Sequence, residues 1–319
     1  MARLTVLVGE NVGEANLTRL RQKFPEVRFV LALTPEEMLV VAPEADVIFT
    51  KSLRPEVLRA ASRLRWVQAG VSGVERMLAA GLRERDVLLT NARGAHGVPI
   101  AEFIVGMMLA FATGLHTLVR AQPRRARVFD PVVSSKFELE GQRLCVLGAG
   151  DIGGTLARKA RALGMRVSVV RRSGAPLADA DDTHPWDRLL ELLPLADHVA
   201  LCLPLTAETA GLIGERELRA MNPTAYVYNV GRGRSIDPDA LVRALQEGWI
   251  AGAGLDVTTP EPLPEDSPLW DMPNVILGQH TSGSSPLNAG RITAIFLENL
   301  GRYLRQEPLI NLVDPRRGY

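Results

Sequence analysis

Short apolar runs alternate with amphipathic stretches along the chain. In the first third, runs rich in branched side chains predict strands, and the stretches between them have the apolar spacing of helices. The predicted strands are 4–8, 27–31, 47–49, 66–68 and 87–89, and helices are expected over 16–23 and 55–61, from Pro35 and from Ser72. This alternation is typical of a mostly parallel sheet with helices on both faces.

Two helix starts in this region have a capping signal. Thr34 precedes Pro35 and stands three residues before Glu37, and Ser72 stands three residues before Glu75. A hydroxyl followed at this distance by Glu predicts a capping box, in which each side chain bonds to the other residue's backbone N–H. We therefore expect Thr34 and Ser72 to cap helices.

The pattern continues in a second series of strands, which follows a long helix. Proline is favoured at the first position of a helix, so the long helix is predicted from Pro99 to about Ala121. Residues 122–141 mix Pro, Arg and Ser and indicate a connection. The second series comprises strands near 144–147, 166–170, 198–201, 225–229 and 275–277, with helices from Asp237 to Gly248 and from Ser285 to about Leu304.

Length and composition describe an ordinary globular protein. The chain has 319 residues, and ~150 residues per domain suggests about two domains. The 37 basic and 36 acidic residues give a net charge of +1, so no overall field attracts a phosphate backbone and no nucleic-acid partner is expected. Two cysteines make no disulfide framework, which favours a reducing compartment. No metal site is expected.

No targeting or membrane segment is evident. The N-terminal run ends at Gly9 and lacks the apolar length and cleavage site of a signal peptide. The most apolar stretch, 103–119, is shorter than the ~20 residues that span a bilayer and contains His116. We interpret it as a buried helix and expect a cytoplasmic protein.

The most informative motif is the glycine-rich turn at 148–153. Its sequence is Gly148-Ala149-Gly150-Asp151-Ile152-Gly153, directly after the predicted strand 144–147 and directly before a helical stretch and another strand. In such a βαβ unit the glycines permit a tight turn, close approach to a pyrophosphate and close helix packing. The turn therefore predicts a dinucleotide site.

The end of the next strand indicates which dinucleotide is preferred. NAD-binding units place a carboxylate there to accept from the ribose hydroxyl, whereas this strand ends in Arg171 and Arg172. Guanidinium groups pair with phosphate in bidentate geometry, so the two arginines favour the 2′-phosphate of NADP. We expect NADP as the cofactor, with NAD possible.

Several later motifs, together with the glycine turn, resemble one family over most of the chain. These motifs are LCLPLTAETAGLI at 201–213, NVGRG at 229–233, LDVTTPEPLP at 255–264 and GQHTSGSS at 278–285. In order and spacing they are similar to D-isomer-specific 2-hydroxyacid dehydrogenases, in particular the glyoxylate/hydroxypyruvate reductases. The resemblance implies NAD(P)H-dependent reduction of a small 2-keto acid to the D-2-hydroxy acid.

The resemblance also implies the architecture. Residues 1–98 and 284–319 would form the substrate domain, and residues 99–283 would form an inserted NAD(P)-binding domain. Both would be doubly wound α/β domains with parallel sheets, Rossmann-like or flavodoxin-like. The active site would lie in the cleft, and members of the family usually pair as homodimers through the dinucleotide domain.

Three residues match the catalytic positions of the family: Arg232, Glu261 and His280. Reduction of a keto acid needs a proton for the carbonyl oxygen, and histidine is the side chain that titrates near neutral pH. A neighbouring carboxylate would orient the imidazole and favour its protonated form. A guanidinium can bind the substrate carboxylate and keto oxygen and stabilise the developing charge.

The remaining site positions come from the same resemblance. Val71, Ser72 and Gly73 would hold the substrate carboxylate through backbone N–H groups, together with Arg232 and His280. Further cofactor contacts are expected at Leu203, Pro204, Thr209, Val230 and Asp256.

The chain departs from the usual family pattern near the substrate. Thr258 stands where Phe is common, Thr281-Ser282-Gly283 replaces Ile-Gly-Gly, and the loop 91–97 carries Arg93 and His96. These changes leave the substrate's identity open.

Other functions fit parts of the sequence. Formate dehydrogenases carry Gln in place of Glu261, which argues against that activity. A short phosphoglycerate dehydrogenase and a dinucleotide-sensing module related to corepressors of this fold both remain as alternatives.

Overall fold

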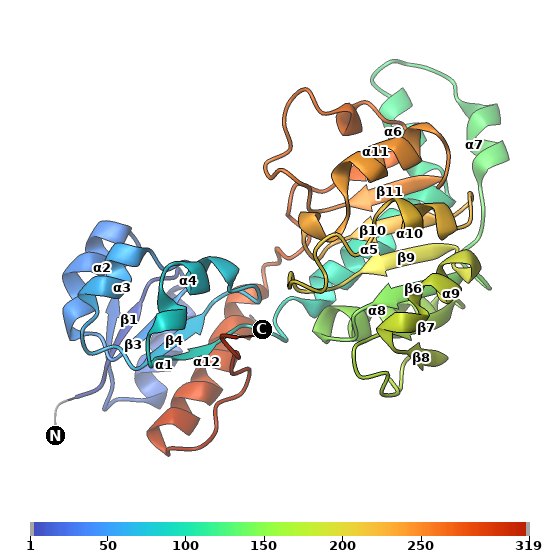
Figure 1. Cartoon of the computed structure of the whole chain (residues 1–319). Helices are drawn as coiled ribbons and strands as arrows, with labels where there is room; N and C mark the ends of the chain where they lie inside the picture. Colours follow the sequence, from blue (N-terminus) through green and yellow to red (C-terminus); the bar gives the residue numbers. More distant parts are fainter. Residues whose placement is uncertain (1–2, 317–319) are drawn as a thin grey trace. The chain divides into compact units, whose positions relative to one another are not determined.

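The computed structural model describes residues 3–316, which form two compact α/β units (Figure 1). Unit 1 contains the chain up to His96 and again from Ser285, and unit 2 is the continuous segment Gly97–Ser284. Each unit has its own parallel sheet, as the sequence predicts. One α/β unit is thus inserted into the chain of the other.

Unit 1 has a five-stranded sheet in the order β2-β1-β3-β4-β5. Its strands are β1 (Thr5–Val8), β2 (Arg28–Leu31), β3 (Val47–Thr50), β4 (Trp66–Ala69) and β5 (Leu88–Thr90). Its helices are α1 (Glu14–Lys23), α2 (Pro35–Val41), α3 (Pro55–Ala60), α4 (Glu75–Ala79) and α12 (Asn288–Leu304).

Alternate residues of these strands enter two cores. Val6 and Val8 of β1 face α1 and α12, whereas Leu7 between them faces α2, α3 and α4. All four residues of β1 are buried, because a parallel sheet is covered on both faces. Phe296 of α12 stacks on Phe49 of β3 with ring centroids 4.5 Å apart, which fixes the last long helix on this sheet.

Unit 2 has a seven-stranded sheet in the order β12-β11-β10-β9-β6-β7-β8. Its strands are β6 (Arg143–Leu147), β7 (Arg166–Val170), β8 (Asp182–His184), β9 (His198–Leu201), β10 (Tyr226–Asn229), β11 (Gly252–Leu255) and β12 (Val275–Leu277). Its helices are α5 (Gly97–Ala112), α6 (Leu115–Ala121), α7 (Phe129–Ser135), α8 (Asp151–Ala162), α9 (Leu189–Leu192), α10 (Glu215–Ala220) and α11 (Pro238–Gln246).

The same alternation divides the residues of this sheet between two helical layers. Leu144 and Val146 of β6 face the core that α5 and α8 close, and Cys145 and Leu147 face the core that α9, α10 and α11 close. Cys145 is buried in this core, and burial raises the pKa of its thiol to about 12. It therefore serves as an apolar core residue rather than a reactive thiol.

Several predicted boundaries are corrected. The helix expected over 99–121 is two helices, α5 and α6, bent by 74° where Gly114 adopts a φ of +69°. The last helix begins at Asn288 rather than Ser285. Ser72 caps no helix, since α4 begins at Glu75 after Val74 and has no side-chain cap. The capping box of Thr34 and Glu37 is confirmed.

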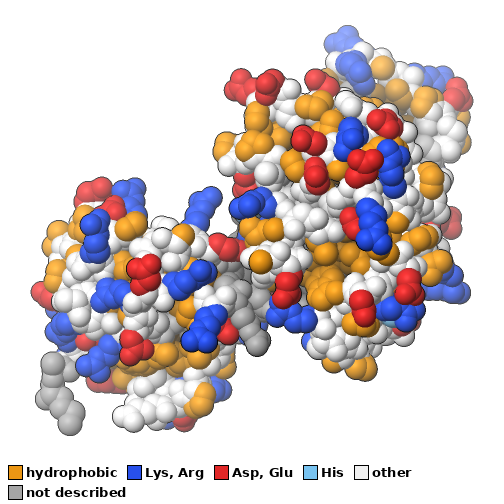
Figure 2. All heavy atoms as spheres, in the orientation of Figure 1, with side chains coloured by type: hydrophobic (Ala, Val, Ile, Leu, Met, Phe, Trp, Pro, Cys, Tyr) orange, Lys and Arg blue, Asp and Glu red, His pale blue; other side chains and the backbone are white. Residues whose placement is uncertain are grey.

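No single helix within residues 3–316 is long and apolar enough to cross a membrane, although the bent pair α5–α6 passes by length and composition together. Eight of the sixteen residues of α5 are buried in the core of unit 2. On the face that Figure 2 shows, basic and acidic side chains are interspersed over both units, in keeping with the net charge of +1.

Candidate active site

The glycine turn joins β6 to α8, and its three glycines have different surroundings. Gly148 has a φ of +99°, and a Cβ there would lie 2.8 Å from the carbonyl oxygen of Cys202. A Cβ on Gly153 would lie 1.9 Å from the carbonyl oxygen of Gly148. A Cβ on Gly150 would meet no atom within 4 Å. The turn is therefore tight at Gly148 and Gly153 and open at Gly150, beside the N-terminus of α8.

The two residues between these glycines pack inside unit 2. Ile152 is half-buried against the core under α5 and α8. The carboxylate of Asp151 lies against the first residue of α5, since a Cβ on Gly97 would be 2.5 Å from its Oδ2. Helix α8 thus presents its N-terminal backbone N–H groups at the turn, a geometry that favours anions.

Arg171 and Arg172 follow the carboxyl end of β7, the strand next to β6. The backbone N–H of Arg171 donates to the carbonyl of His184 at 3.0 Å, which holds the strand end. The Arg172 guanidinium donates to Glu208 at 2.5 Å, and both side chains are about half exposed or more, at 47% and 65%. Such an exposed pair contributes at most ~1 kcal/mol, so an incoming phosphate can displace it.

The loop after β9 contains Leu203, Pro204 and Thr209. The Thr209 hydroxyl donates to the Pro204 carbonyl at 2.7 Å and accepts from the Thr206 backbone N–H at 2.8 Å. Leu203, Thr209 and also Val230, after β10, are nearly buried. Thr209 therefore fixes the shape of this loop, and Leu203 and Val230 belong to the core at its base.

Arg232 lies in the loop that follows β10. Buried Asn229 shapes this loop, because its side chain accepts from the Gly231 N–H at 3.1 Å and donates to the Arg232 carbonyl at 2.9 Å. A Cβ on Gly233 would lie 1.9 Å from the Thr258 carbonyl oxygen, so the loops after β10 and β11 are packed directly together. The half-buried Arg232 stands between these two constraints.

Asp256, at the end of β11, anchors the loop that carries His280. Its carboxylate accepts from the backbone N–H groups of Thr281, at 2.8 Å, and Ser282, at 3.1 Å, and from the Ser282 hydroxyl. Its own carbonyl accepts from the His280 N–H. With 2% of its surface exposed, Asp256 is a buried anchor.

His280 and Glu261 are in direct contact, through Nδ1 of the imidazole and Oε1 of the carboxylate. The histidine side chain is 53% exposed and the glutamate side chain 39%. Glu261 comes from the proline-rich segment after β11, and His280 from the segment after β12. The contact therefore leaves Nε2 of His280 as the ring nitrogen that can exchange a proton with a ligand.

The backbone at His280 is unusual for residues other than glycine. Gln279 and His280 have φ angles of +54° and +57°, in the left-handed region that such residues seldom adopt. Conformations of this kind cost ~1–3 kcal/mol each and persist where the surroundings impose them. Here the bonds to Asp256 impose them, and the imidazole is directed at Glu261.

In unit 1, the loop 71–73 follows β4. The Asn91 side chain donates to the Ser72 carbonyl at 2.9 Å, the Ala92 N–H donates to the Val71 carbonyl at 3.0 Å, and the Ser72 hydroxyl lies 3.3 Å from Nδ1 of His96. The backbone bonds use the carbonyls of Val71 and Ser72. Among the described residues, no acceptor takes the N–H groups of Val71, Ser72 or Gly73.

Comparison with known proteins identifies the family. Residues 105–282 match the D-isomer specific 2-hydroxyacid dehydrogenase, NAD binding domain. The glyoxylate reductase of Korarchaeum cryptofilum is 31% identical over 97% of this chain and 95% of its own length. The chain belongs to the D-isomer-specific 2-hydroxyacid dehydrogenases.

Solved structures agree with this assignment. A D-isomer specific 2-hydroxyacid dehydrogenase family protein from Aeromonas salmonicida superposes with a TM-score of 0.88 at 31% identity, over 98% of this chain and all of the other. The dehydrogenase from Xanthobacter autotrophicus, solved with NADPH and MES, gives 0.86 at 28% identity over both full chains. Unit 2 of this dehydrogenase thus contains the family's NAD-binding domain.

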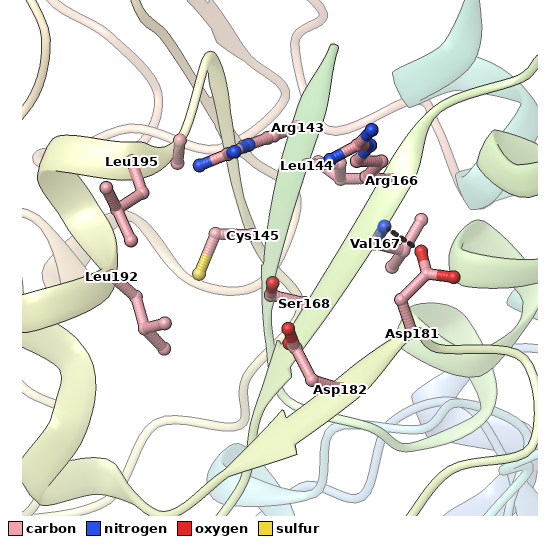
Figure 3. A pocket seen from close by; sticks show the side chains of 11 residues that line it. Arg143, Leu144, Cys145, Arg166, Val167, Ser168, Asp181, Asp182, Leu192 and Leu195 are labelled. Carbon is pink, nitrogen blue, oxygen red and sulfur yellow. Dashed lines mark hydrogen bonds between the residues drawn. The ribbon is translucent and has the colours of Figure 1, made fainter. Parts of the chain in front are cut away.

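This dehydrogenase also has a cavity of about 330 Å³ in unit 2, at the amino ends of β6 and β7 (Figure 3). It is lined by the first residues of β6 and β7, Arg143–Cys145 and Arg166–Ser168, and by Asp181 and Asp182 at β8. The glycine turn follows the carboxyl end of β6. The cavity is therefore separate from the dinucleotide turn.

Some residues that build the site of the dehydrogenase were not singled out from the sequence. Asn229 and Ser282 hold the loops that bear Arg232 and His280. The sequence could have indicated a role for Asn229, since it is the polar last residue of an otherwise apolar strand. Ser282 lies in a segment that departs from the usual family pattern, but no sequence pattern predicts its contact with Asp256, 26 residues away.

Proposed function

We propose that this dehydrogenase reduces a small 2-keto acid of the glyoxylate or hydroxypyruvate type to the D-2-hydroxy acid, with NADPH preferred and NADH possible. The observation that carries the proposal is the contact between His280 and Glu261 on a backbone that Asp256 holds in a strained conformation. Strain of this kind at an exposed imidazole indicates a functional constraint.

The residues of the glycine turn fit a dinucleotide. The turn is open where a Cβ on Gly150 would stand, beside the N–H groups of a 12-residue helix. These groups suit a pyrophosphate, and Asp151, Ile152, Leu203, Pro204, Thr209, Val230 and Asp256 are the further residues that we assign to the cofactor site. When bound, the nicotinamide supplies the hydride.

The chain's own residues then handle the proton and the charge. His280 gives the proton from Nε2 to the keto oxygen, and Glu261 orients the ring through Nδ1. Arg232 binds the carboxylate and the keto oxygen and stabilises the negative charge that develops there. Asp256 acts through the backbone of the His280 loop and is a positioning residue in this reaction.

The substrate carboxylate is assigned to the loop after β4. The N–H groups of Val71, Ser72 and Gly73 can donate to an anion, and bonds from Ala92 and Asn91 to the carbonyls of Val71 and Ser72 hold the loop in place. Successive backbone N–H groups form anion-binding concavities of this kind.

NADPH preference rests on Arg171 and Arg172. They occupy the strand end where a carboxylate would select NAD, and guanidinium groups suit a phosphate. The relative from Xanthobacter autotrophicus was solved with NADPH, which supports the same choice here.

We also propose a homodimer that pairs through unit 2. Helices α6 and α7 expose Leu115, Leu118, Val119, Phe129 and Val133, each at least 43% accessible. The two helices adjoin, because the Val132 side chain of α7 packs at Gly114 just before α6. Contiguous exposed apolar side chains of this kind mark protein contacts.

The decisive experiment is NADPH oxidation by the purified protein with a panel of 2-keto acids. Steady oxidation with glyoxylate or hydroxypyruvate, and formation of the D isomer, is expected. Binding of NADPH without turnover on any acid would contradict the proposal and favour a dinucleotide-sensing module. A preference for 3-phosphohydroxypyruvate would favour a short phosphoglycerate dehydrogenase.

A further inference from the structure

The cavity of unit 2 in Figure 3 has no part in the proposed reaction. Its volume of about 330 Å³ lies at the lower end of the ~300–1,000 Å³ typical of small-molecule sites, so it suits a ligand smaller than a nucleotide. The cavity lies at the amino end of β6, and the glycine turn follows the carboxyl end of this five-residue strand. At ~3.3 Å per residue, about 16 Å of strand separates the cavity from the dinucleotide turn.

The register of the sheet places the polar lining residues in two rows on one face. Arg143 of β6 is paired with Arg166 of β7. Two residues further along, Ser168 of β7 is paired with Asp182 of β8 and, on its other side, with Cys145 of β6. Paired residues, and residues two apart on one strand, direct their side chains to the same face. Figure 3 accordingly shows the two arginines at one end of the cavity and Ser168 and Asp182 at the other.

Arg143 and Arg166 are adjacent cations without a counter-ion. Both residues are exposed, and neither guanidinium has a hydrogen-bond or ion-pair partner within residues 3–316. Neighbouring strands lie ~4.8 Å apart, so two like charges in register repel each other. An anion bound to both would remove this repulsion, and a carboxylate offers an oxygen to each guanidinium. This end of the cavity therefore favours a carboxylate.

Asp182 gives the opposite end of the cavity a negative charge. Its side chain is 52% exposed, and the basic group beside it is the imidazole of His184, with Nε2 at 3.1 Å. In the described part of unit 2 no partner takes the neighbouring Ser168 hydroxyl. Asp181, the other acid of the lining, already accepts from the Val167 N–H at 2.7 Å. Carboxylate and hydroxyl oxygens accept from N–H donors, so this end favours an ammonium group.

The side of the cavity between these two ends is apolar. Leu192, the last residue of α9, and Leu195, in the turn that follows, line it together with Ala196. Leu195 is 54% exposed, although it adjoins the core under α9. An apolar group placed against Leu195 would remove that surface from water, which is favourable.

We propose that this cavity binds a small α-amino acid with an apolar side chain, such as leucine. The carboxylate bonds to Arg143 and Arg166, the ammonium bonds to Asp182 and Ser168, and the side chain packs against Leu195. A 2-keto acid has no ammonium group for Asp182. The ligand of this cavity therefore differs from the substrate of the proposed reaction, and its binding does not depend on that reaction.

Calorimetric titration of the whole chain with four compounds tests the three contacts separately. The compounds are L-leucine, 4-methylpentanoate, which lacks the ammonium, 3-methylbutylamine, which lacks the carboxylate, and glycine, which lacks the apolar side chain. Leucine should bind, and each of the other three should bind more weakly by about tenfold or more, because each loses one contact. Neither NADPH nor glyoxylate should displace leucine. Absence of leucine binding, equal affinities for all four compounds, or displacement by glyoxylate would overturn the proposal.

Variants of the two rows locate the binding in this cavity. The double variant Arg143→Gln/Arg166→Gln should weaken leucine binding by about tenfold or more. Without ligand its melting temperature should not fall, because the substitutions remove a repulsion. Arg188→Gln, which breaks an exposed pair with Glu191 in the same unit, is the control and should bind leucine as the wild type does. Leucine binding that survives the double variant, or that is lost in Arg188→Gln, would contradict the assignment.

Asp182→Asn gives a comparison between two ligands in one protein, so a change in stability cancels. The ratio of the affinities for leucine and 4-methylpentanoate should fall by about tenfold, because only leucine has an ammonium that needs the carboxylate. An unchanged ratio would show that Asp182 does not select the ammonium and would overturn the amino-acid assignment.

Discussion

At the residue scale, the exposed imidazole of His280 is oriented by groups that are themselves buried or tied. The ring contacts Glu261, and the backbone beneath it is bonded to Asp256, which has 2% of its surface exposed. Charged and aromatic side chains in open loops usually sample many rotamers. Here the strain of a left-handed backbone is balanced by fixed hydrogen bonds, which is how a proton donor can be held ready for a ligand.

Replacement of His280 tests the proton transfer. His280→Ala should lower kcat by about 100- to 10,000-fold, because positioned acid–base groups contribute on that order. NADPH affinity, measured by fluorescence titration, should stay within about twofold. His116→Gln is the matched control, since His116 lies in α6 and bonds to the Ala110 carbonyl. Near-normal turnover in His280→Ala would refute the assignment.

Replacement of Arg172, after β7, tests the proposed preference for NADPH over NADH. Arg172→Ser should lower kcat/KM for NADPH by about ten- to a hundredfold, since a bond to a charged group contributes ~1.5–3 kcal/mol. The value for NADH should change far less. Arg188→Ser, which removes an exposed arginine paired with Glu191 in the same unit, is the control. Equal losses with both cofactors would count against a 2′-phosphate contact.

At the element scale, the proposed site lies at the carboxyl ends of β6, β10, β11 and β12, whose loops are held by close backbone contacts. Two glycines show how. Gly233 lies directly on the Thr258 carbonyl, and Gly153 lies on the carbonyl of Gly148. A side chain at Gly233 would push the loop after β10 away from the loop after β11, and a side chain at Gly153 would distort the turn between β6 and α8. The strands set the order of the loops, and these close approaches set their spacing.

Substitutions of the neighbouring residues Gly153 and Gly154 test whether the close approach at Gly153 holds the turn in place. Gly153→Ala should displace the turn, destabilise unit 2 by ~1–3 kcal/mol and weaken NADPH binding, because its Cβ would overlap a carbonyl oxygen. Gly154→Ala meets no atom within 4 Å and should stabilise helix α8 by ~0.5–1 kcal/mol. Thermal unfolding and dinucleotide titration would measure both. A stable, tightly binding Gly153→Ala would contradict the packing argument.

His198 on β9 makes the stability of unit 2 depend on pH. Its ring is fully buried, 3.0 Å from the Tyr228 hydroxyl and 2.5 Å from Oε1 of Gln142. Burial lowers the pKa of His198 from 6.5 to about 4. Between those values the unfolded chain binds a proton that the folded unit does not, so stability falls as the pH drops from about 6.5 to 4.

The expected loss over that range is about 3 kcal/mol in the free energy of unfolding. Urea unfolding at several pH values would measure it. His198→Gln does not titrate there and should show a shallower decline than the wild type below pH 6.5. Parallel declines in the two proteins would exclude His198 as the cause.

At the scale of the whole molecule, the segment that forms unit 2 is inserted into the chain of unit 1. Unit 1 is therefore completed only by α12, the last helix of the chain. Phe296 and Leu300 of α12 fill the core against β1 and β3, although β1 begins at Thr5 and β3 at Val47, far earlier in the chain. Unit 2 leaves an apolar surface on α6 and α7. We propose that the molecule pairs with a second copy through that surface.

Charges placed on that surface test the homodimer. The wild type should be a dimer in size-exclusion chromatography with light scattering, and Leu118→Asp or Phe129→Asp should be a monomer, because a buried carboxylate without a partner is costly. Val40→Asp is the control, since Val40 of α2 is 80% exposed in unit 1. A wild-type monomer, or a dimer unaffected by both substitutions, would contradict the proposal.

Some secondary structure was not predicted from the sequence, because tertiary packing overrides the local helix and strand propensities there. The strand β11 reads Gly-Ala-Gly-Leu, a poor strand sequence, yet a Cβ on Gly254 would lie 2.7 Å from the sulfur of Met107 in α5. The strand has small side chains because α5 packs closely against it. Only the tertiary structure reveals this contact. Likewise Gly114 breaks the long helix at a point where the apolar pattern runs on without change.

Local pattern was enough to determine the two parallel sheets, the glycine turn and the family, because strand alternation, helix starts and motif spacing are properties of neighbouring residues. Asp256 under the His280 loop, Asn229 beneath Arg232 and the pair of Glu10 with Lys51 depend on residues far apart in sequence. Only the folded chain decides which distant side chains share a buried hydrogen bond, since burial and distance have no signature in a linear pattern.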